Sequence, residues 1–267
     1  MRSIRLLIEY EGTRYHGWQV QPNGLTVQEV VEKAIARITG QSVRLLAAGR
    51  TDAGVHALGQ VAGFRLKGEI DLDRLHRGIN ALTPRDVSIL AAEEAPARFS
   101  AKSWAKSKRY TYLILNRPEP PAVLRRFCWH VKHPLALGPM RKATERLVGT
   151  HDFSAFRSSD CSSTRPVQDM IRAGIRSNRG GMIALDFEAT GFLKHMVRAI
   201  VGTLVEVGLG KRAPEDLGAV LESRDRGSAG PTAPPQGLFL VSVRYEDGFG
   251  EQIARQRSSL RGILPLI

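Results

Sequence analysis

The feature that most constrains the fold of this 267-residue chain is an order of strands and helices that occurs twice. Apolar residues at every second position predict strands, whereas apolar residues three and four apart predict helices. In the first half these patterns predict a strand, a helix, two strands, a helix and a strand, over residues 3–10, 26–40, 43–48, 60–66, 71–83 and 87–94. This order, β-α-β-β-α-β, is typical of a ferredoxin-like unit.

The second half repeats this order once a short helix at 214–222 is set aside. Its predicted elements lie at 107–116, 139–149, 167–177, 182–188, 192–207 and 237–245, with a short additional strand near 128–131. Residues 178–181, Asn-Arg-Gly-Gly, are a strong hairpin signal between two of these strands. In the first helix, Thr26 and Glu29 are spaced as a capping box, and Gly40 is suited to end the helix.

These patterns predict an α+β fold made of two ferredoxin-like halves. We expect mainly antiparallel sheets joined side by side, with helices on one face and a cleft on the other. The predicted halves are residues 1–100 and 101–248, followed by a tail at 249–267. The repeat is inferred from element order alone, since the halves share no obvious sequence identity.

Positive charge points to an acidic partner. Hydrophobic residues make up 42% and charged residues 24%, as in ordinary globular proteins, but the net charge is +13. Between Arg98 and Lys142 there are eleven Lys or Arg residues and a single acid, Glu119. Such clustering favours a face that contacts nucleic-acid phosphates over scattered charge, although a merely basic surface is the alternative.

The two cysteines, Cys128 and Cys161, are too few for a disulfide framework and indicate a reducing compartment. We see no signal peptide, and no apolar stretch approaches the roughly 20 residues that a membrane helix needs. The expected location is therefore cytoplasmic, without a membrane partner.

A glycine-punctuated loop from Ala47 to Ala57 combines three reactive residue types within seven positions, Arg50, Asp52 and His56. Glycines give such a loop backbone conformations closed to other residues. A guanidinium close to Asp52 favours the ionised carboxylate, which suits a nucleophile or an electrostatic stabiliser. The alternatives are a plain turn and a surface ion pair contributing under about 1 kcal/mol.

Two further segments could contribute to a site. Tyr110 shares a strand face with Lys108 and Tyr112 in the basic region, where an aromatic ring can stack on a base or can simply pack in the sheet. Lys194 and Arg198 are four apart in the predicted helix, so they could face a phosphate or carboxylate, or solvent.

Metal and hydrolase chemistry are less well supported. Cys128, His130 and His133 match no common zinc spacing, so no metal site is expected there. The pair His151 and Asp152 has no accompanying serine or cysteine elbow. We interpret that pair as a helix-end cap beside packing phenylalanines.

Taken together, the motifs resemble the tRNA pseudouridine synthase A family in order and over roughly residues 3–245. The matching stretches are Glu9–Gly12, Tyr15–Gln19, Ala48–Ala57, Phe99–Ala101, Lys108–Tyr112, Gly149–Phe156, Gly191–Arg198 and Ala233–Leu238. The string Gly-Arg-Thr-Asp-x-Gly-Val-His-Ala is specific to this family among pseudouridine synthases. Lys194 departs from the family pattern, and the tail after residue 248 extends beyond it.

The resemblance implies a cofactor-free isomerase that converts uridine to pseudouridine at positions 38, 39 and 40 of the tRNA anticodon stem-loop. Asp52 would be the nucleophile, attacking ribose C1′ or uracil C6. Tyr110 would stack on the flipped uracil, Arg198 would pair with Asp52, and Arg50 would help to extrude the nucleotide, with His56 also among the substrate-binding residues. A homodimer is implied, and Asp52 is expected in a cleft between the halves, near Tyr110 and Arg198.

Two other functions remain open from the sequence. A non-catalytic RNA-binding module would bind tRNA without changing it, and loss of Asp52 would have no measurable effect. A metal-dependent hydrolase using His130, His133 or His151 would be inactivated by chelators.

Overall fold

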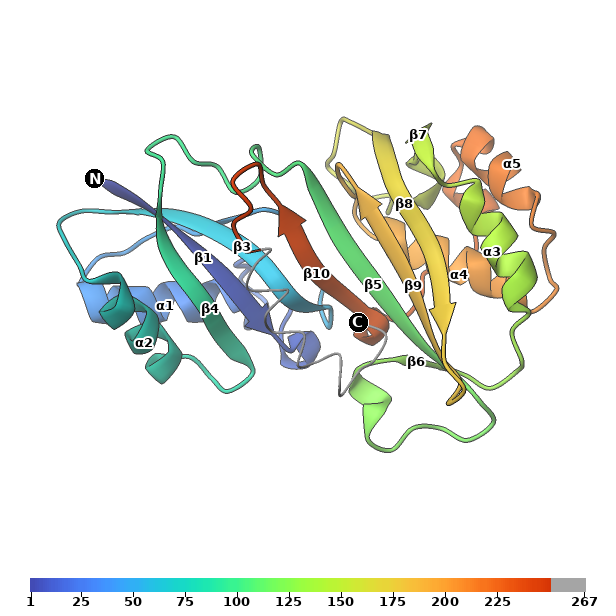
Figure 1. Cartoon of the computed structure of the whole chain (residues 1–267), viewed down its shortest axis with the longest axis horizontal. Helices are drawn as coiled ribbons and strands as arrows, with labels where there is room; N and C mark the ends of the chain where they lie inside the picture. The colour runs from blue at the N-terminus through green and yellow to red at the C-terminus, as the bar shows by residue number, and fades with distance from the viewer. Residues whose placement is uncertain (251–267) are drawn as a thin grey trace. The chain divides into compact units, whose positions relative to one another are not determined.

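The computed structural model describes residues 1–250 and shows a mixed α+β fold with mainly antiparallel strand pairing (Figure 1). Within these residues the chain forms two compact units, one made of residues 1–106 with 239–250 and the other of residues 107–238. The described part contains five α-helices, none of them long and apolar enough to cross a membrane. The predicted tail at 249–267 falls almost wholly outside the described residues.

The first unit is built around β1 (Arg2–Tyr10), which lies between β3 (His56–Leu66) and β4 (Val87–Ala95) and is antiparallel to both. The short β2 (Leu46–Ala47) pairs antiparallel with β3. The predicted order of elements is confirmed, but β3 begins four residues before residue 60 and β2 is shorter than the predicted 43–48.

Two helices, α1 (Val27–Thr39) and α2 (Leu72–Leu82), pack against each other, and α2 also packs on β4. Their buried side chains recur at helical spacing: Val27, Val31, Ala34 and Ile35 in α1, and Leu75 and Ile79 in α2. The Thr26 side chain accepts the Glu29 N–H, which is one half of the predicted capping box, while the Glu29 carboxylate accepts from Lys33. Gly40 ends α1 as predicted, in the left-handed conformation at φ 70°.

The last strand, β10 (Leu238–Arg244), runs parallel to β3 with Phe239 opposite His56. The chain after it packs on the same unit: the Tyr245 hydroxyl donates to the Ala101 carbonyl at 2.7 Å. The Arg5 guanidinium lies 4.0 Å from the centre of the Phe249 ring. The order of elements along the sequence does not predict the pairing of β10 with β3.

In the second unit, β9 (Met182–Ala189) lies between β5 (Ser107–Asn116) and β8 (Val167–Ser177) and is antiparallel to both. The short β7 (Gly149–Asp152) extends the sheet antiparallel to β8, and β6 (Trp129–Val131) pairs parallel with β5. The hairpin predicted at 178–181 is confirmed, since it joins β8 to β9.

The helices of this unit are α3 (Leu137–Glu145), α4 (Met196–Gly208) and α5 (Asp216–Ser223), and α3 packs on both α4 and β8. Two predicted boundaries are wrong. Helix α3 ends four residues before Gly149, because the chain from that glycine pairs with β8 as β7. Helix α4 begins four residues after 192, because His195 adopts the left-handed conformation at φ 64° and interrupts helical geometry.

Candidate active site

The loop that bears Asp52 is held by the backbone of a second loop, residues 12–18, within the first unit. The Trp18 N–H donates to the Thr51 carbonyl at 3.1 Å, and the Gly54 N–H donates to the Tyr15 carbonyl at 3.3 Å. The Asp52 carbonyl itself accepts the Val55 N–H at 3.2 Å. These backbone bonds fix the chain immediately before and after Asp52.

The two loops approach so closely that glycine is required at the contacts. A Cβ atom at Gly12 would lie 2.0 Å from the Val55 carbonyl oxygen. Gly17 adopts φ 85°, and a Cβ there would lie 2.6 Å from the Thr51 carbonyl oxygen. Gly12 and Gly17 are therefore required by close contacts with residues about forty positions later in the sequence.

Buried polar side chains support the Asp52 loop from beneath. The hydroxyls of Tyr10 and Thr51 are hydrogen-bonded at 2.8 Å, and the Gln60 side-chain amide donates to the Gly49 carbonyl at 2.7 Å. Gln60 is 0% and Tyr10 3% exposed. Burial raises the pKa of Tyr10 to about 12, so its hydroxyl stays protonated at neutral pH.

His56 closes the far end of the loop from the start of β3. Its ring nitrogen Nδ1 accepts the Gly12 N–H at 3.1 Å, and its ring stacks on Phe239 with centroids 4.8 Å apart. The side chain is 1% exposed. The imidazole therefore joins both loops to β10.

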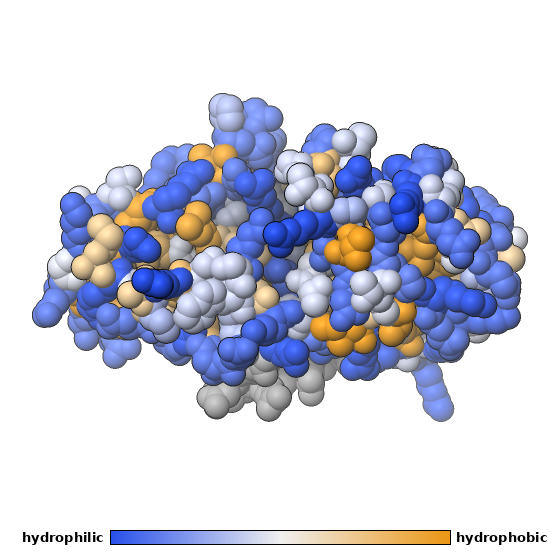
Figure 2. All heavy atoms as spheres, turned by 90° about the horizontal axis from the view of Figure 1, so that it is seen from above, coloured by the Kyte–Doolittle hydropathy of each residue, from blue (hydrophilic) through white to orange (hydrophobic). Residues whose placement is uncertain are grey.

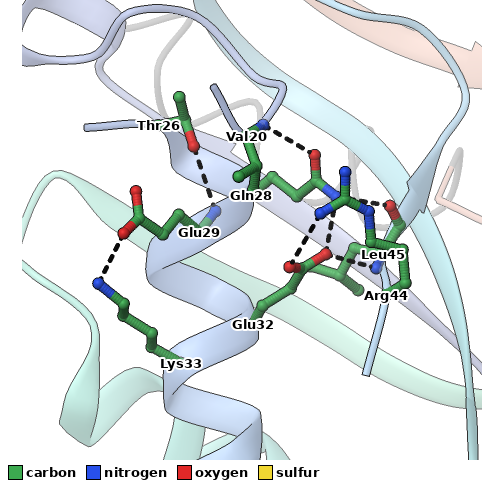
Figure 3. Close-up of polar contacts among 8 residues, drawn as sticks. All are labelled: Val20, Thr26, Gln28, Glu29, Glu32, Lys33, Arg44 and Leu45. Carbon is green, nitrogen blue, oxygen red and sulfur yellow. Dashed lines mark hydrogen bonds and ion pairs between the residues drawn. The ribbon is translucent and has the colours of Figure 1, made fainter. Parts of the chain in front are cut away.

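Helix α1 holds the chain at one end of each loop (Figure 3). Gln28 accepts the Val20 N–H at 3.1 Å and donates to the Leu45 carbonyl at 3.1 Å, while Glu32 accepts the Leu45 N–H at 2.7 Å. Val20 follows the first loop and Leu45 precedes the second. The position of the Asp52 loop thus depends on α1 as well as on the sheet.

In this frame Asp52 is half-buried and Arg50 is exposed. A carboxylate on an anchored backbone keeps only its side-chain rotations, which is the arrangement that a nucleophile needs.

The second unit holds Tyr110 in β5, opposite Phe187 of β9. The Tyr110 ring packs edge-on against Phe192, with centroids 4.9 Å apart and planes at 75°. Tyr112, two residues on, donates its hydroxyl to the Pro234 carbonyl at 2.7 Å, which links β5 to the loop before β10.

Arg198 lies in the first turn of α4 and is tied to the same loop. Its Nε donates to the Ala233 carbonyl at 2.8 Å, and its own carbonyl accepts the Ala233 N–H at 3.0 Å. A Cβ at Gly202, one turn further on, would lie 1.7 Å from the Pro231 carbonyl oxygen. The loop that contains Pro231 and Ala233 is thus packed directly against α4.

Lys194 does not share a helical flank with Arg198 as predicted, because it precedes α4. It forms an ion pair with Asp160. Hydrogen bonds from Lys194 and Ser158 lower the pKa of Asp160 to about 2.

Sequence reasoning missed the buried carboxylate of Asp186 in β9, whose side chain is 4% exposed. It accepts hydrogen bonds from Arg176 at 2.6 Å, Thr111 at 2.7 Å and Arg109 at 3.1 Å. Burial alone would raise its pKa, but these hydrogen bonds together hold the pKa below its usual value. The available signal was an acid between apolar residues, Met182 to Leu185 before it and Phe187 after it.

The residues considered for metal or hydrolase chemistry have other contacts. The Cys128 thiol donates to the Leu124 carbonyl at 3.3 Å, and burial raises its pKa to about 11. His130 and His151 hydrogen-bond the carbonyls of Arg117 and Val148. Among residues 1–250, no three His, Cys, Asp or Glu side chains gather as metal ligands would.

His151 and Asp152 lie at the end of β7, directly before a short 3-10 helix, Ser154–Phe156. The Asp152 carboxylate accepts the N–H of Ser154, the first residue of that helix, at 2.9 Å, whereas the His151 ring has no such role. The phenylalanines beside it, Phe153 and Phe156, are fully buried as expected.

The structure therefore groups Arg50, Asp52 and His56 on one unit, and Tyr110 and Arg198 on the other. The predicted approach of Asp52 to Tyr110 and Arg198 stays a prediction.

Comparison with known proteins identifies the family. The family model described as tRNA pseudouridine synthase matches residues 6–102 and 143–246. The tRNA pseudouridine synthase A of Thermoanaerobacter sp. (strain X514) is 46% identical over 245 residues, which are 92% of this chain and 100% of that protein. That of Myxococcus xanthus is 45% identical over 248 residues, 93% of this chain and 94% of that protein.

The chain belongs to the tRNA pseudouridine synthase A family. The resemblance predicted from the motifs is confirmed. The first range matched by the tRNA pseudouridine synthase model contains Arg50, Asp52 and His56, the second contains Arg198, and Tyr110 lies between the two ranges. Among solved structures, a chain of the archaeal box H/ACA sRNP Nop10–Cbf5 complex aligns with 85% of this chain and 60% of its own length, at 14% identity and a TM-score of 0.33.

Proposed function

We propose that this protein isomerises uridine to pseudouridine at positions 38, 39 and 40 of the tRNA anticodon stem-loop, with Asp52 as the nucleophile. The reaction breaks the bond from ribose C1′ to uracil N1 and forms a bond from C1′ to C5. C5 loses a proton and N1 gains one, so the product has the same atoms as the substrate. No oxidant, reductant or co-substrate is needed, which agrees with a cofactor-free enzyme.

The observation that carries this proposal is the anchored backbone on both sides of Asp52. Attack on C1′ or C6 requires the carboxylate to meet one atom of an extruded nucleotide, and a fixed loop lowers the entropic cost of that geometry. The exposed Arg50, two residues away, is suited to fill the space that the nucleotide leaves.

The second unit supplies the remaining roles. Tyr110 stacks on the uracil, with Phe192 against its edge, and Arg198 pairs with the Asp52 carboxylate. His56 is also among the proposed substrate-binding residues, although its side chain is buried at the start of β3, where the Asp52 loop ends. In this proposal residues 1–100 and 101–248 are ferredoxin-like halves with the site in a cleft between them, and the enzyme is a cytoplasmic homodimer.

Exposed cations of the second unit are suited to contact RNA phosphates. Arg117 and Arg125 are exposed, hydrogen-bond the backbone carbonyls of Glu119 and Ala122, and have no acidic partner among residues 1–250. Most side chains on the face seen in Figure 2 are hydrophilic, with apolar patches between them.

The decisive experiment uses unmodified tRNA without cofactors and maps pseudouridine by chemical labelling. The wild-type protein should produce label at positions 38 to 40. Asp52→Asn should lower turnover by at least about a thousandfold while tRNA still binds, because the amide is a poor nucleophile. Asp73→Asn, the same charge change at an exposed position of α2, should retain full activity.

The other outcomes are equally informative. Turnover that persists in Asp52→Asn would remove Asp52 as the nucleophile, and wild-type label at other uridines would remove the assignment to positions 38 to 40. Binding without any label would favour the non-catalytic RNA-binding module.

A further inference from the structure

A pair of buried hydroxyl groups lies directly beneath the Asp52 loop. Tyr10 is the last residue of β1, and Thr51 immediately precedes Asp52. Their oxygens are 2.8 Å apart, and the residues are 3% and 7% exposed. Neither hydroxyl is part of the proposed chemistry.

We propose that Tyr10 and Thr51 are positioning residues whose hydroxyl pair fixes the orientation of Asp52 for attack. The inference rests on the proposed function of Asp52 as the nucleophile. It assigns the two residues no contact with RNA and no transfer of a proton.

Tyr10 is a rigid point of attachment. Its backbone pairs with Ala57 of β3 on one side and Val87 of β4 on the other, so it sits in the middle of three strands. Its ring lies 6.1 Å from the Trp18 ring, centroid to centroid, in the buried interior. A hydroxyl on such a ring has little freedom to follow a moving loop.

Thr51 receives restraints at two atoms. Its carbonyl accepts the Trp18 N–H at 3.1 Å, and its Oγ1 meets the Tyr10 hydroxyl. The backbone bond restrains the peptide plane between Thr51 and Asp52 through its carbonyl oxygen. The hydroxyl bond restrains the same residue through its side chain, so Thr51 is held at a second point beside Asp52.

The same support continues on the other side of Arg50. The Gln60 amide donates to the Gly49 carbonyl at 2.7 Å, so the loop is held two residues before Thr51 as well. A loop anchored at Gly49 and Thr51 presents Arg50 and Asp52 in a fixed relation. Loss of the Tyr10–Thr51 bond should therefore disturb Asp52 more than it disturbs the fold.

The test uses near-isosteric variants and single-turnover formation of pseudouridine, at a temperature well below each Tm. Tyr10→Phe and Thr51→Val should each lower the rate constant about 10- to 100-fold, as a displaced reacting group does, with the Kd for tRNA unchanged within about twofold. Thr51→Ser keeps the hydroxyl and should recover most of the rate. The double variant Tyr10→Phe/Thr51→Val should be no slower than the slower single variant, because each substitution removes the same Tyr10–Thr51 hydrogen bond.

Tyr245→Phe is the matched control. Tyr245 is also buried in the first unit, 4% exposed, and its hydroxyl donates to the Ala101 carbonyl at 2.7 Å, away from the Asp52 loop. It should lower the Tm as Tyr10→Phe does, yet leave the rate constant unchanged.

Several results would overturn the proposal. Unchanged rates in Tyr10→Phe and Thr51→Val, beside an inactive Asp52→Asn, would refute positioning and leave the proposed nucleophile in place. An equal rate loss in Tyr245→Phe would show a general effect of stability. If Tyr10→Phe does not fold, the contrast between Thr51→Val and Thr51→Ser decides the question alone.

Discussion

The two units fix their functional segments with different kinds of interaction. Around Asp52 the anchoring groups are neutral: backbone amides, two hydroxyls and the Gln60 amide. The strand that bears Tyr110 is fixed through the ionised carboxylate of Asp186 and two guanidinium groups. The neutral groups add no further charge beside the Asp52 carboxylate, whereas the second unit holds its strands together with one carboxylate and two guanidinium groups.

This difference has physical consequences. Close backbone packing tolerates no added atom, because backbone has no rotamer to move to. An ionic network tolerates small changes of volume but depends on the charge of one carboxylate. Substitutions that add volume should therefore damage the first unit most, and changes of charge the second.

The largest effect is expected for Gly12→Ala. Its Cβ would lie 2.0 Å from the Val55 carbonyl oxygen, which belongs to backbone and has no rotamer to move to. We expect the free energy of unfolding to fall by about 3 kcal/mol, and turnover to be lost as the Asp52 loop is displaced. Urea denaturation and the labelling assay would measure the two effects.

Gly40→Ala is the control for this prediction. Gly40 has a positive φ of 70°, which Gly12 does not, but a Cβ at Gly40 meets nothing within 4 Å. It should cost about 1 kcal/mol from backbone strain alone and leave turnover unchanged. Equal losses in the two variants would contradict the importance of the loop contact.

The second prediction removes the charge at the centre of the other unit. Asp186→Asn leaves Arg109 and Arg176 facing a neutral amide that cannot accept from both as a carboxylate does. The loss should be about 2 kcal/mol, less than for a fully buried pair, because the two arginine side chains are 34% and 39% exposed.

The pH dependence provides the sharper measurement. The pKa of Asp186 is lower in the folded protein than in the unfolded chain, where it is near 3.9. Its stabilisation is therefore fully present above about pH 5 and is lost as the pH falls through the lowered folded value. The stability difference between wild type and Asp186→Asn should shrink over that acidic range, and a difference that stays constant would contradict an ionised Asp186.

The contrast between the units also explains how far the sequence could be interpreted. Element order, the hairpin at 178–181, the cap at Thr26 and the family motifs depend on neighbours in sequence, and each was predictable. The contacts of Gly12 and Gly17 with the Asp52 loop depend on residues about forty positions away, so the glycines were visible but their partners were not. Helix α4 begins later than predicted because His195 adopts a left-handed backbone conformation. The sequence around His195 gives no sign of that conformation.

Asp186 could have been suspected for a different reason. A carboxylate in an apolar strand costs several kcal/mol unless it is paired, so its presence implies partners on adjacent strands. The sequence does not say which of the many arginines they are, because that depends on register. The pairing of β5 with β9 places Thr111 opposite Asp186, with Arg109 two residues away on the same face.

The smallest effect is expected from the outward charges of the second unit. Arg117→Gln with Arg125→Gln should weaken tRNA binding several-fold at moderate salt and reduce the slope of log Kd against log salt by about 1 to 2, since each phosphate contact contributes about 0.7 to 0.9. Stability and single-turnover rate should not change, because both side chains are exposed. Arg74→Gln with Arg77→Gln removes two exposed cations from α2 of the first unit and should leave the slope unaltered. If both double variants change the slope equally, phosphate contact is spread over both units, and the division into a neutral frame for chemistry and a charged unit for docking would be wrong.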